Sequence, residues 1–181
     1  MDQENNRNRM ASEIDVNLDR DEFLRSLLQK LAGTLESVVG LAESAGFISV
    51  VGQEMGSELD ERYRNELHVD QLDRHQVADV LVDLKRRIQG DFRVVHQDEG
   101  RIEFANRACP FGERVVGHPS MCMMTSNVFG SITAQNLGYA KVVLLETIAT
   151  GAAGCSVVVH TLPTPAAEAA SGREYFAHDA E

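Results

Sequence analysis

Two β-patterned runs near the C-terminal end of the chain constrain the fold more than any other feature. Residues 142–148 and 156–162 are rich in β-branched and apolar side chains, and a Gly-containing segment at 150–154 separates them. Two such runs around a Gly-rich turn predict an antiparallel hairpin. A second hairpin is predicted for residues 92–104, where two short alternating runs flank Asp98-Glu99-Gly100. The fold must therefore contain antiparallel strands.

Helical periodicity accounts for most of the remaining sequence. Apolar residues recur at helical spacing over residues 21–46, 47–63 and 73–90. A fourth helix is predicted between the hairpins, over residues 119–138, with a proline near its first turn and a glycine just beyond its end. Segregated helices and antiparallel strands predict the α+β class. We expect N-terminal helices packed on a small antiparallel sheet made of hairpins, with one further helix between the hairpins.

Two details of the first helices bear on packing. In the first helix, leucines and a valine recur at steps of four and three, and Gly46 is expected to end it. This stripe fits either the core face of one globular domain or a helix that pairs with a second chain. In the second helix, Gly52 and Gly56 lie four residues apart, which predicts tight helix packing or close approach of a ligand.

Composition indicates where the folded domain begins and ends and in which cellular compartment the protein is expected. Of the 181 residues, 43% are hydrophobic, which predicts one domain over residues 20–162. Residues 1–19 are too polar to fold, and residues 163–181 are rich in Ala, Glu and Pro, so we expect a disordered arm and a disordered tail. The sequence has no membrane span and no signal peptide, which predicts a cytoplasmic protein. A net charge of -11 argues against direct nucleic-acid binding.

The chain has three cysteines, Cys109, Cys122 and Cys155. The last hairpin would fold Cys155 back towards the other two, and three thiols in a reducing compartment stay free, bind metal or cycle through redox states. Cys122 is expected in the first turn of a helix, where the helix dipole lowers the pKa of a thiol. These positions predict a shared thiol site.

The nature of that site stays open at this point. Zinc and iron–sulfur clusters usually need four ligands, so His118 is the predicted fourth donor beside the three cysteines. Three further side chains are weaker alternatives, namely Glu146, His96 and His160. A reversible redox switch between Cys109 and Cys122 is a second interpretation, and purely structural cysteines are a third.

An apolar ligand pocket and an enzyme site are further interpretations of the same region. The pocket would be lined by Met121, Met123, Met124, Phe129 and Tyr139, although residues at this spacing also suit an ordinary core. A Cys-His nucleophile would need a third orienting group and an oxyanion hole, and the sequence indicates neither. We therefore expect no catalytic residues.

The cysteine-bearing motifs resemble a known family. Three motifs are similar to those of the methanogen output domain family of small signalling proteins: Asn106-x-x-Cys-Pro-Phe-Gly, His118-Pro-Ser-x-Cys and Glu146-Thr-x-x-x-Gly-x-x-x-Cys. The resemblance runs from about residue 41 to 163. The cysteine segment also resembles 4-vinyl-reductase-type ligand-binding domains and the sensory half of winged-helix repressors that hold an iron–sulfur cluster. The 4-vinyl-reductase pattern often has a further cysteine near the position of Ala149. Unlike in the winged-helix repressors, no winged helix precedes this domain.

The resemblance implies a regulatory output or sensor role. The three cysteines match the family's thiol positions, and the family's role implies no catalytic residues. We expect a cytoplasmic signalling domain that forms a homodimer and controls a partner signalling protein, through a metal, an iron–sulfur cluster or a thiol-redox site. The alternative is a small-molecule-binding regulatory module with structural cysteines.

Overall fold

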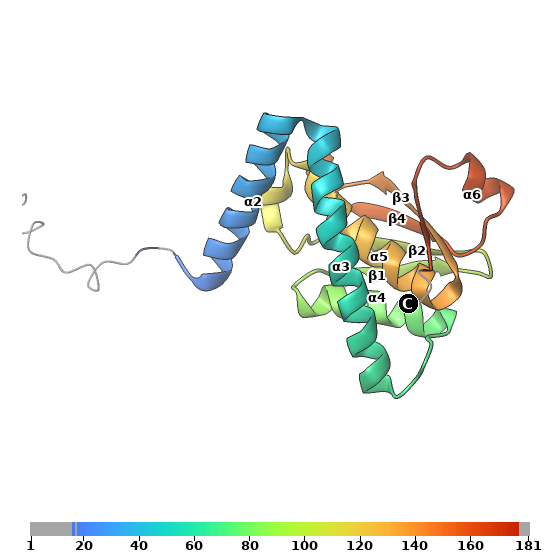
Figure 1. Cartoon of the computed structure of the whole chain (residues 1–181). Coiled ribbons are helices and arrows are strands. Elements are labelled where there is room, and N and C mark those ends of the chain that lie inside the picture. Colours follow the sequence, from blue (N-terminus) through green and yellow to red (C-terminus); the bar gives the residue numbers. More distant parts are fainter. Residues whose placement is uncertain (1–15, 17, 178–181) are drawn as a thin grey trace, which may run out of the picture.

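The computed structural model describes residue 16 and residues 18–177, so most of the predicted N-terminal arm lies outside the described residues. The chain has the predicted α+β fold (Figure 1). Its helices and strands are α2 (Arg20–Val39), α3 (Leu41–Leu67), α4 (Arg74–Arg87), β1 (Arg93–Gln97), β2 (Arg101–Asn106), α5 (Cys122–Leu137), β3 (Tyr139–Glu146), β4 (Cys155–His160), α6 (Pro165–Ala169) and β5 (Arg173–Phe176). Short 3-10 turns, η2 (Gly112–Val115), η3 (Pro119–Met121) and η4 (Ile148–Thr150), fill the connections.

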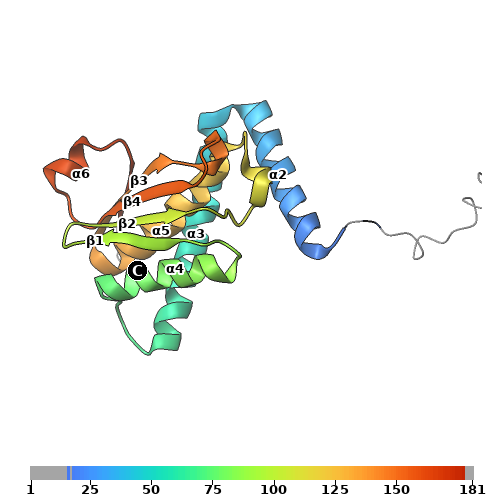
Figure 2. The same ribbon diagram turned by 180° about the vertical axis from the view of Figure 1, so that it is seen from behind.

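The strands form one antiparallel sheet in the order β1-β2-β4-β3-β5. Both predicted hairpins, β1–β2 and β3–β4, are confirmed. Helix α5 packs on the sheet, α3 packs on α5, and α4 contacts α5 and β1 (Figures 1 and 2). The centre of the core is Phe129 of α5, whose ring lies 5.5 Å from that of Phe92 and 5.2 Å from that of Phe104.

Helix α4 begins and helix α5 ends as the sequence predicts, whereas α4 ends at Arg87, before Gly90, and α5 begins at Cys122, after a 3-10 turn. The Asp73 carboxylate accepts a hydrogen bond of 2.9 Å from the Gln76 amide, and the Gln76 side chain accepts one of 2.9 Å from the Asp73 amide, which completes a capping box. Helix α5 ends at Gly138, which has a φ of 85°. Glycine adopts this left-handed conformation without the steric cost that a Cβ imposes.

The predicted boundary between the first two helices is wrong. Helix α2 ends at Val39, and α3 begins at Leu41 and not near Phe47. The break is at Gly40, where φ is 84°. Gly46 lies inside α3, and no other atom would lie within 4 Å of a Cβ there. Gly40 takes a positive φ that favours glycine, and spacing alone does not show which glycine will do so.

The two glycines of α3 pack as predicted, against another helix. A Cβ on Gly52 would lie 2.9 Å from the Asn127 Cβ, and one on Gly56 would lie 2.7 Å from the Ser131 Cβ. These distances are shorter than ordinary van der Waals contact, so any larger residue would push α3 away from α5. Tight helix packing, and not a ligand, accounts for this pair.

The expectation of a disordered tail is wrong for residues 165–176. Strand β5 pairs with β3, and Tyr175 packs directly over Gly130 of α5, where a Cβ would lie only 2.1 Å from the tyrosine ring. The Tyr175 hydroxyl also forms a hydrogen bond of 2.9 Å with the Ser126 hydroxyl. Pairing with β3 and the contact of Tyr175 with Gly130 order this segment, and local composition reveals neither. No helix within the described residues is long and apolar enough to cross a membrane.

Candidate functional site: a cysteine-lined cavity beside a buried lysine

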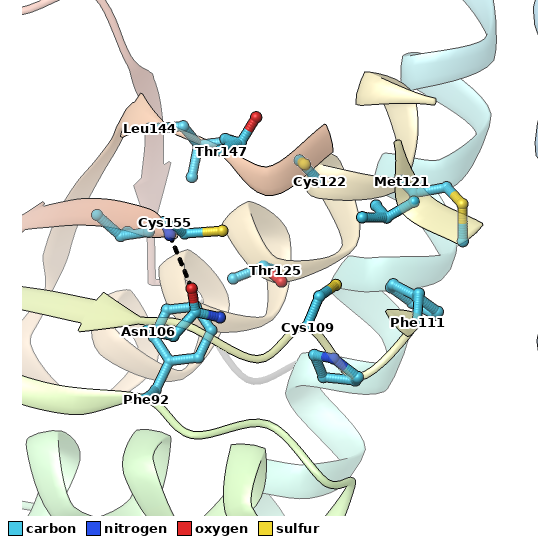
Figure 3. A pocket seen from close by; sticks show the side chains of 13 residues that line it. Phe92, Asn106, Cys109, Phe111, Met121, Cys122, Thr125, Leu144, Thr147 and Cys155 are labelled. Atoms are coloured by element: carbon cyan, nitrogen blue, oxygen red, sulfur yellow. Dashed lines mark hydrogen bonds between the residues drawn. The ribbon is translucent and has the colours of Figure 1, made fainter. Parts of the chain in front are cut away.

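The three cysteines line one small apolar cavity of about 30 Å³, which has room for one or two water molecules (Figure 3). The cavity lies between the start of α5, the ends of β3 and β4, and the loop that follows β2. Its lining residues are Phe92, Asn106, Cys109, Pro110, Phe111, Val115, Met121, Cys122, Thr125, Leu144, Thr147, Cys155 and Val157.

Asn106 fixes the approach of Cys155 to the β2 loop. It pairs with Cys155 across β2 and β4, and its side-chain oxygen accepts a hydrogen bond of 2.8 Å from the Cys155 amide (Figure 3). The Asn106 side-chain nitrogen donates to the carbonyl of Ala108, which precedes Cys109. Gly154 permits this contact, because a Cβ there would lie 2.3 Å from the Asn106 carbonyl oxygen. The prediction that the last hairpin folds Cys155 towards the other cysteines is confirmed.

The thiols are not activated in the way the sequence suggested. Burial raises the pKa of all three cysteines, and that of Cys122 to about 11. For Cys122 this desolvation outweighs a hydrogen bond with Thr147 and the charge of Lys85, both of which lower the pKa. The expectation of a low thiol pKa at this position is therefore wrong, and the three cysteines are protonated thiols at neutral pH.

A lysine that sequence patterns did not assign to the site lies beside these thiols. Lys85 is buried, its ammonium donates a hydrogen bond of 2.8 Å to Thr125 Oγ1, and it lies 5.5 Å and 5.4 Å from the ring centres of Phe92 and Phe129. Burial lowers the pKa of Lys85 to about 8, and the nearby cysteines oppose this shift. Lys85 comes four residues after Leu81, so helical period places it on the apolar face of α4.

The predicted fourth metal ligand has another partner. His118 Nδ1 lies 2.9 Å from Glu36 Oε2 of α2, and the imidazole packs against Gly33. Within the described ranges, no group of three or more His, Cys, Asp or Glu side chains is arranged to hold a metal ion. Metal binding needs thiolates, and burial raises the pKa of all three thiols, so a metal would have to displace their protons. The zinc or iron–sulfur site therefore stays a prediction from the sequence.

The weaker candidate ligands lie apart from the cysteines. His96 is exposed on β1, with its Nε2 atom 3.0 Å from Asp98 Oδ2. His160 ends β4, at the opposite end of that strand from Cys155. Glu146 is exposed at the end of β3. The structure brings the three cysteines together and brings none of these side chains to them.

The predicted ligand-pocket residues are divided between two environments. Met121 and Met124 line a second apolar cavity, of about 220 Å³, which lies between α2 and α3. Phe129 is buried in the core, and Tyr139 donates a hydrogen bond of 2.9 Å to Glu174 of β5. Met123 accepts a hydrogen bond on its carbonyl oxygen from Asn127. We call the second cavity the α2–α3 groove; its lining residues are Leu28, Leu31, Ala32, Leu35, Phe47, Ile48, Val51, Phe111, Met121 and Met124.

The cysteine-lined cavity and the α2–α3 groove share two walls. Phe111 and Met121 line both of them, and both side chains lie on one side of the cysteines (Figure 3). Met121 is flexible at its side-chain torsions, and a methionine adapts easily to a change in its surroundings. The two spaces are therefore adjacent, with these two side chains between them.

Comparisons with known proteins match this geometry at the level of family and fold. The family model described as methanogen output domain 1 matches residues 27–160. One similar structure is the phenol-responsive sensory domain of the transcription activator PoxR, solved with phenol. Its sequence is 15% identical to this one, the TM-score is 0.64, and the match covers 86% of this chain and 81% of that one. Another is a trafficking protein particle complex subunit 3 from Naegleria fowleri, covalently bound to palmitic acid. Its sequence is 11% identical to this one, the TM-score is 0.55, and the match covers 87% of this chain and 99% of that one. No curated protein sequence matches.

Proposed function

This chain belongs to the methanogen output domain 1 family, and from that premise we propose that it is a regulatory sensor domain, not an enzyme, that binds a small apolar molecule with one polar end. The family and the fold support a regulatory sensor role. The single observation that carries the ligand class is the pairing of an apolar cavity with the buried Lys85 ammonium, which donates a hydrogen bond to Thr125 of the cavity lining.

The size of the site supports a small ligand. The cysteine-lined cavity alone is too small for an organic molecule, but movement of Phe111 and Met121 would add the α2–α3 groove to it. The combined space approaches the lower end of small-molecule pockets, about 300 Å³. An apolar body would then pack against Phe111 and Met121. Its oxygen-bearing end would accept a hydrogen bond from Lys85 or Thr125.

The structural neighbours support the same ligand class. One is solved with phenol and the other carries palmitic acid. Both molecules combine an apolar body with an oxygen-bearing end. At 15% and 11% identity these neighbours share a fold with this chain, so the ligand is argued from the cavity and the buried lysine.

Titration of the full-length protein with phenol and, separately, with palmitate tests this proposal. We expect saturable binding by calorimetry of at least one probe, and a loss of roughly tenfold or more in affinity for Lys85→Met, because a charge-assisted hydrogen bond is lost. Lys30→Met, at an exposed position of α2, is the matched control and should bind as wild type does. If neither probe saturates, or if both lysine variants bind equally well, the proposed ligand class is wrong.

A thiol site is a second candidate, favoured by one observation: three cysteines from three separate segments line a single cavity. In this alternative the cysteines hold zinc or an iron–sulfur cluster, or cycle through redox states. Protein purified without oxygen would show iron, sulfide and broad absorbance near about 400 nm for a cluster, or stoichiometric zinc without colour. Cys155→Ser should abolish the metal, whereas His118→Ala should not. Metal-free protein would leave only the redox form of this alternative.

The output would pass through α2 to a partner signalling protein in the cytoplasm. Phe111 and Met121 belong to the segment on which α2 rests, because η2 and η3 both contact α2. A ligand that displaces these side chains would shift the support of α2 and change what a partner protein contacts. Ligand-dependent hydrogen exchange in α2 would test this step, and unchanged exchange in α2 on saturation would contradict it.

A further inference from the structure

Helix α2 is oriented with its polar side towards its own domain. Glu22 and Gln29 contact Arg114 of η2, and Glu36 contacts His118 at the start of η3. Hydrogen bonds and ion pairs therefore hold this side of α2 to the domain, beside the apolar contacts of the small residue Ala32. A surface helix usually does the opposite and buries its apolar stripe.

The apolar side of α2 is exposed. Leu31, at the middle of this side, is 53% exposed. The large apolar residues of α2 with more than a third of their surface exposed are Phe23, Leu24, Leu27, Leu28, Leu31, Val38 and Val39. An unbroken apolar stripe of this length in contact with water is costly, since each such side chain gains about 1.5–3 kcal/mol from full burial.

The first half of α3 is oriented in the same way, with its large apolar residues exposed. Its buried residues are small or polar, among them Ser49, Gly52 and Gly56, which face α5. Its exposed residues are large and apolar, namely Leu41, Phe47, Val50, Val51 and Met55. Helices α2 and α3 diverge from their junction at Gly40, and the α2–α3 groove lies between them (Figures 1 and 2).

We propose that this surface binds a second copy of the chain, so that α2 of each copy packs across the open side of the α2–α3 groove of the other and covers it. Leu24, Leu28, Leu31, Leu35 and Val38 follow one another at steps of four, three, four and three residues. That spacing is the a and d pattern of helices that pair with copies of themselves. We call the stripe formed by these five residues the seam. Leu28, Leu31 and Leu35 of the seam also line the groove, so the seam and the groove form one continuous surface.

The exposed apolar area is sufficient for a stable dimer. Twelve large apolar residues of α2 and the first half of α3 are each exposed by between 38% and 75%. With roughly 150 Å² for each side chain, the patch amounts to about 900 Å², and a standard interface buries about 800 Å² on each partner. A two-fold interface uses the same patch on both copies, which satisfies both surfaces at once.

A lipid surface fits the patch less well. Helices that lie on membranes carry an excess of Lys and Arg on the polar face, which attracts anionic lipids. Helix α2 has no such excess, because its carboxylates (Asp21, Glu22 and Glu36) balance its cations (Arg20, Arg25 and Lys30). Several of these side chains are already engaged with the domain, and the whole chain carries a net charge of -11.

Sedimentation velocity on the full-length protein tests the proposal, with two matched leucine variants. We expect wild type to be dimeric at micromolar concentration, and Leu31→Glu to weaken the dimer by about 100-fold or more because it places a charge in the seam. Leu145→Glu, at a site on β3 that is 62% exposed and outside the patch, should dimerise as wild type does. Because residue 31 is half exposed in the single chain, circular dichroism of Leu31→Glu should match wild type.

A second variant protects the test against misfolding of the first. Phe47→Glu introduces a charge on α3, across the groove from α2, at a residue that is 57% exposed. It should also yield a monomer. A wild-type protein that stays monomeric up to about 100 µM, or glutamate variants that dimerise as well as wild type, would overturn the proposal. So would wild-type monomers that bind phosphatidylserine vesicles through this patch.

Discussion

The Lys85 ammonium donates a hydrogen bond of 2.8 Å to Thr125 Oγ1 in the core, beside three thiols and two phenylalanine rings. An ammonium in such surroundings is costly, because desolvation disfavours the charged form. The hydrogen bond and the rings offset part of this cost. This pair places a titratable charge next to the cysteine-lined cavity, and it makes the stability of the fold depend on pH.

We predict that Lys85→Met is at least as stable as wild type at pH 7, and that its advantage shrinks as pH rises. Burial lowers the pKa of Lys85 from 10.5 to about 8, which corresponds to a cost on the order of 3 kcal/mol that is fully present below pH 8. Between the two values the unfolded chain binds more protons than the folded chain. Wild type therefore gains stability relative to the variant with rising pH.

Urea denaturation at pH 7, 8 and 9 measures this dependence. The difference between the unfolding free energies of the two proteins should fall by about 1 kcal/mol over this range. Ionisation of cysteines in the unfolded chain affects both proteins equally and cancels in the comparison. Lys30→Met, at an exposed site, serves as the control and should follow wild type at each pH. A stability difference for Lys85→Met that does not change with pH would contradict the prediction.

The thiols should react slowly in the folded protein. Burial raises the pKa of all three, and that of Cys122 to about 11. Because the thiolate is the reactive form, we expect a disulfide reagent at pH 7.5 to modify native protein at least tenfold more slowly than unfolded protein, as an order of magnitude. A fast-reacting thiol in the native state would instead point to an activated cysteine and favour the redox interpretation.

Gly130→Ala should destabilise the fold and release the C-terminal segment. The new Cβ would lie 2.1 Å from a ring carbon of Tyr175, so one of the two must move, at a cost of about 1–3 kcal/mol. Urea denaturation measures the loss, and limited proteolysis detects release of β5. Gly46→Ala is the matched control, because it lies in a helix with open space around it and should stabilise by roughly 0.5–1 kcal/mol. Equal stability of both variants would disprove the packing of Tyr175.

His118→Ala should loosen α2 without changing metal content. Burial opposes ionisation of Glu36, but hydrogen bonds from Ser120 and His118 outweigh it and lower the pKa of Glu36. Removal of the imidazole should raise that pKa and cost about 1–2 kcal/mol of stability. Nuclear magnetic resonance titration of Glu36 and hydrogen exchange of α2 are the two readouts. His96→Ala, exposed on β1, should change neither.

Local patterns of residues were reliable wherever one element determines its own conformation. The capping box of Asp73 and Gln76 marks the start of α4, and Gly138 marks the end of α5. The two hairpins were predictable for the same reason, because turn residues and alternation act over a few neighbouring positions. The meeting of the cysteines followed from the second hairpin, since pairing of β4 with its neighbours fixes where Cys155 lies.

The surroundings of the candidate site residues depend on contacts between distant segments of the chain. Helical period shows that Lys85 shares a face with Leu81, but only packing against Phe92 and Phe129 shows that the lysine is buried. The same holds for His118, whose partner Glu36 lies 82 positions away.

The sequence by itself determined the α+β class, the two hairpins, the start of α4, the end of α5 and the grouping of Cys109, Cys122 and Cys155. The tertiary structure alone decided that β5 is ordered by Tyr175 over Gly130, and that α2 turns its apolar side outward. The physical reason is the same in each case. Periodicity reports which side chains share a face, whereas burial, pKa and exposure depend on what lies opposite that face.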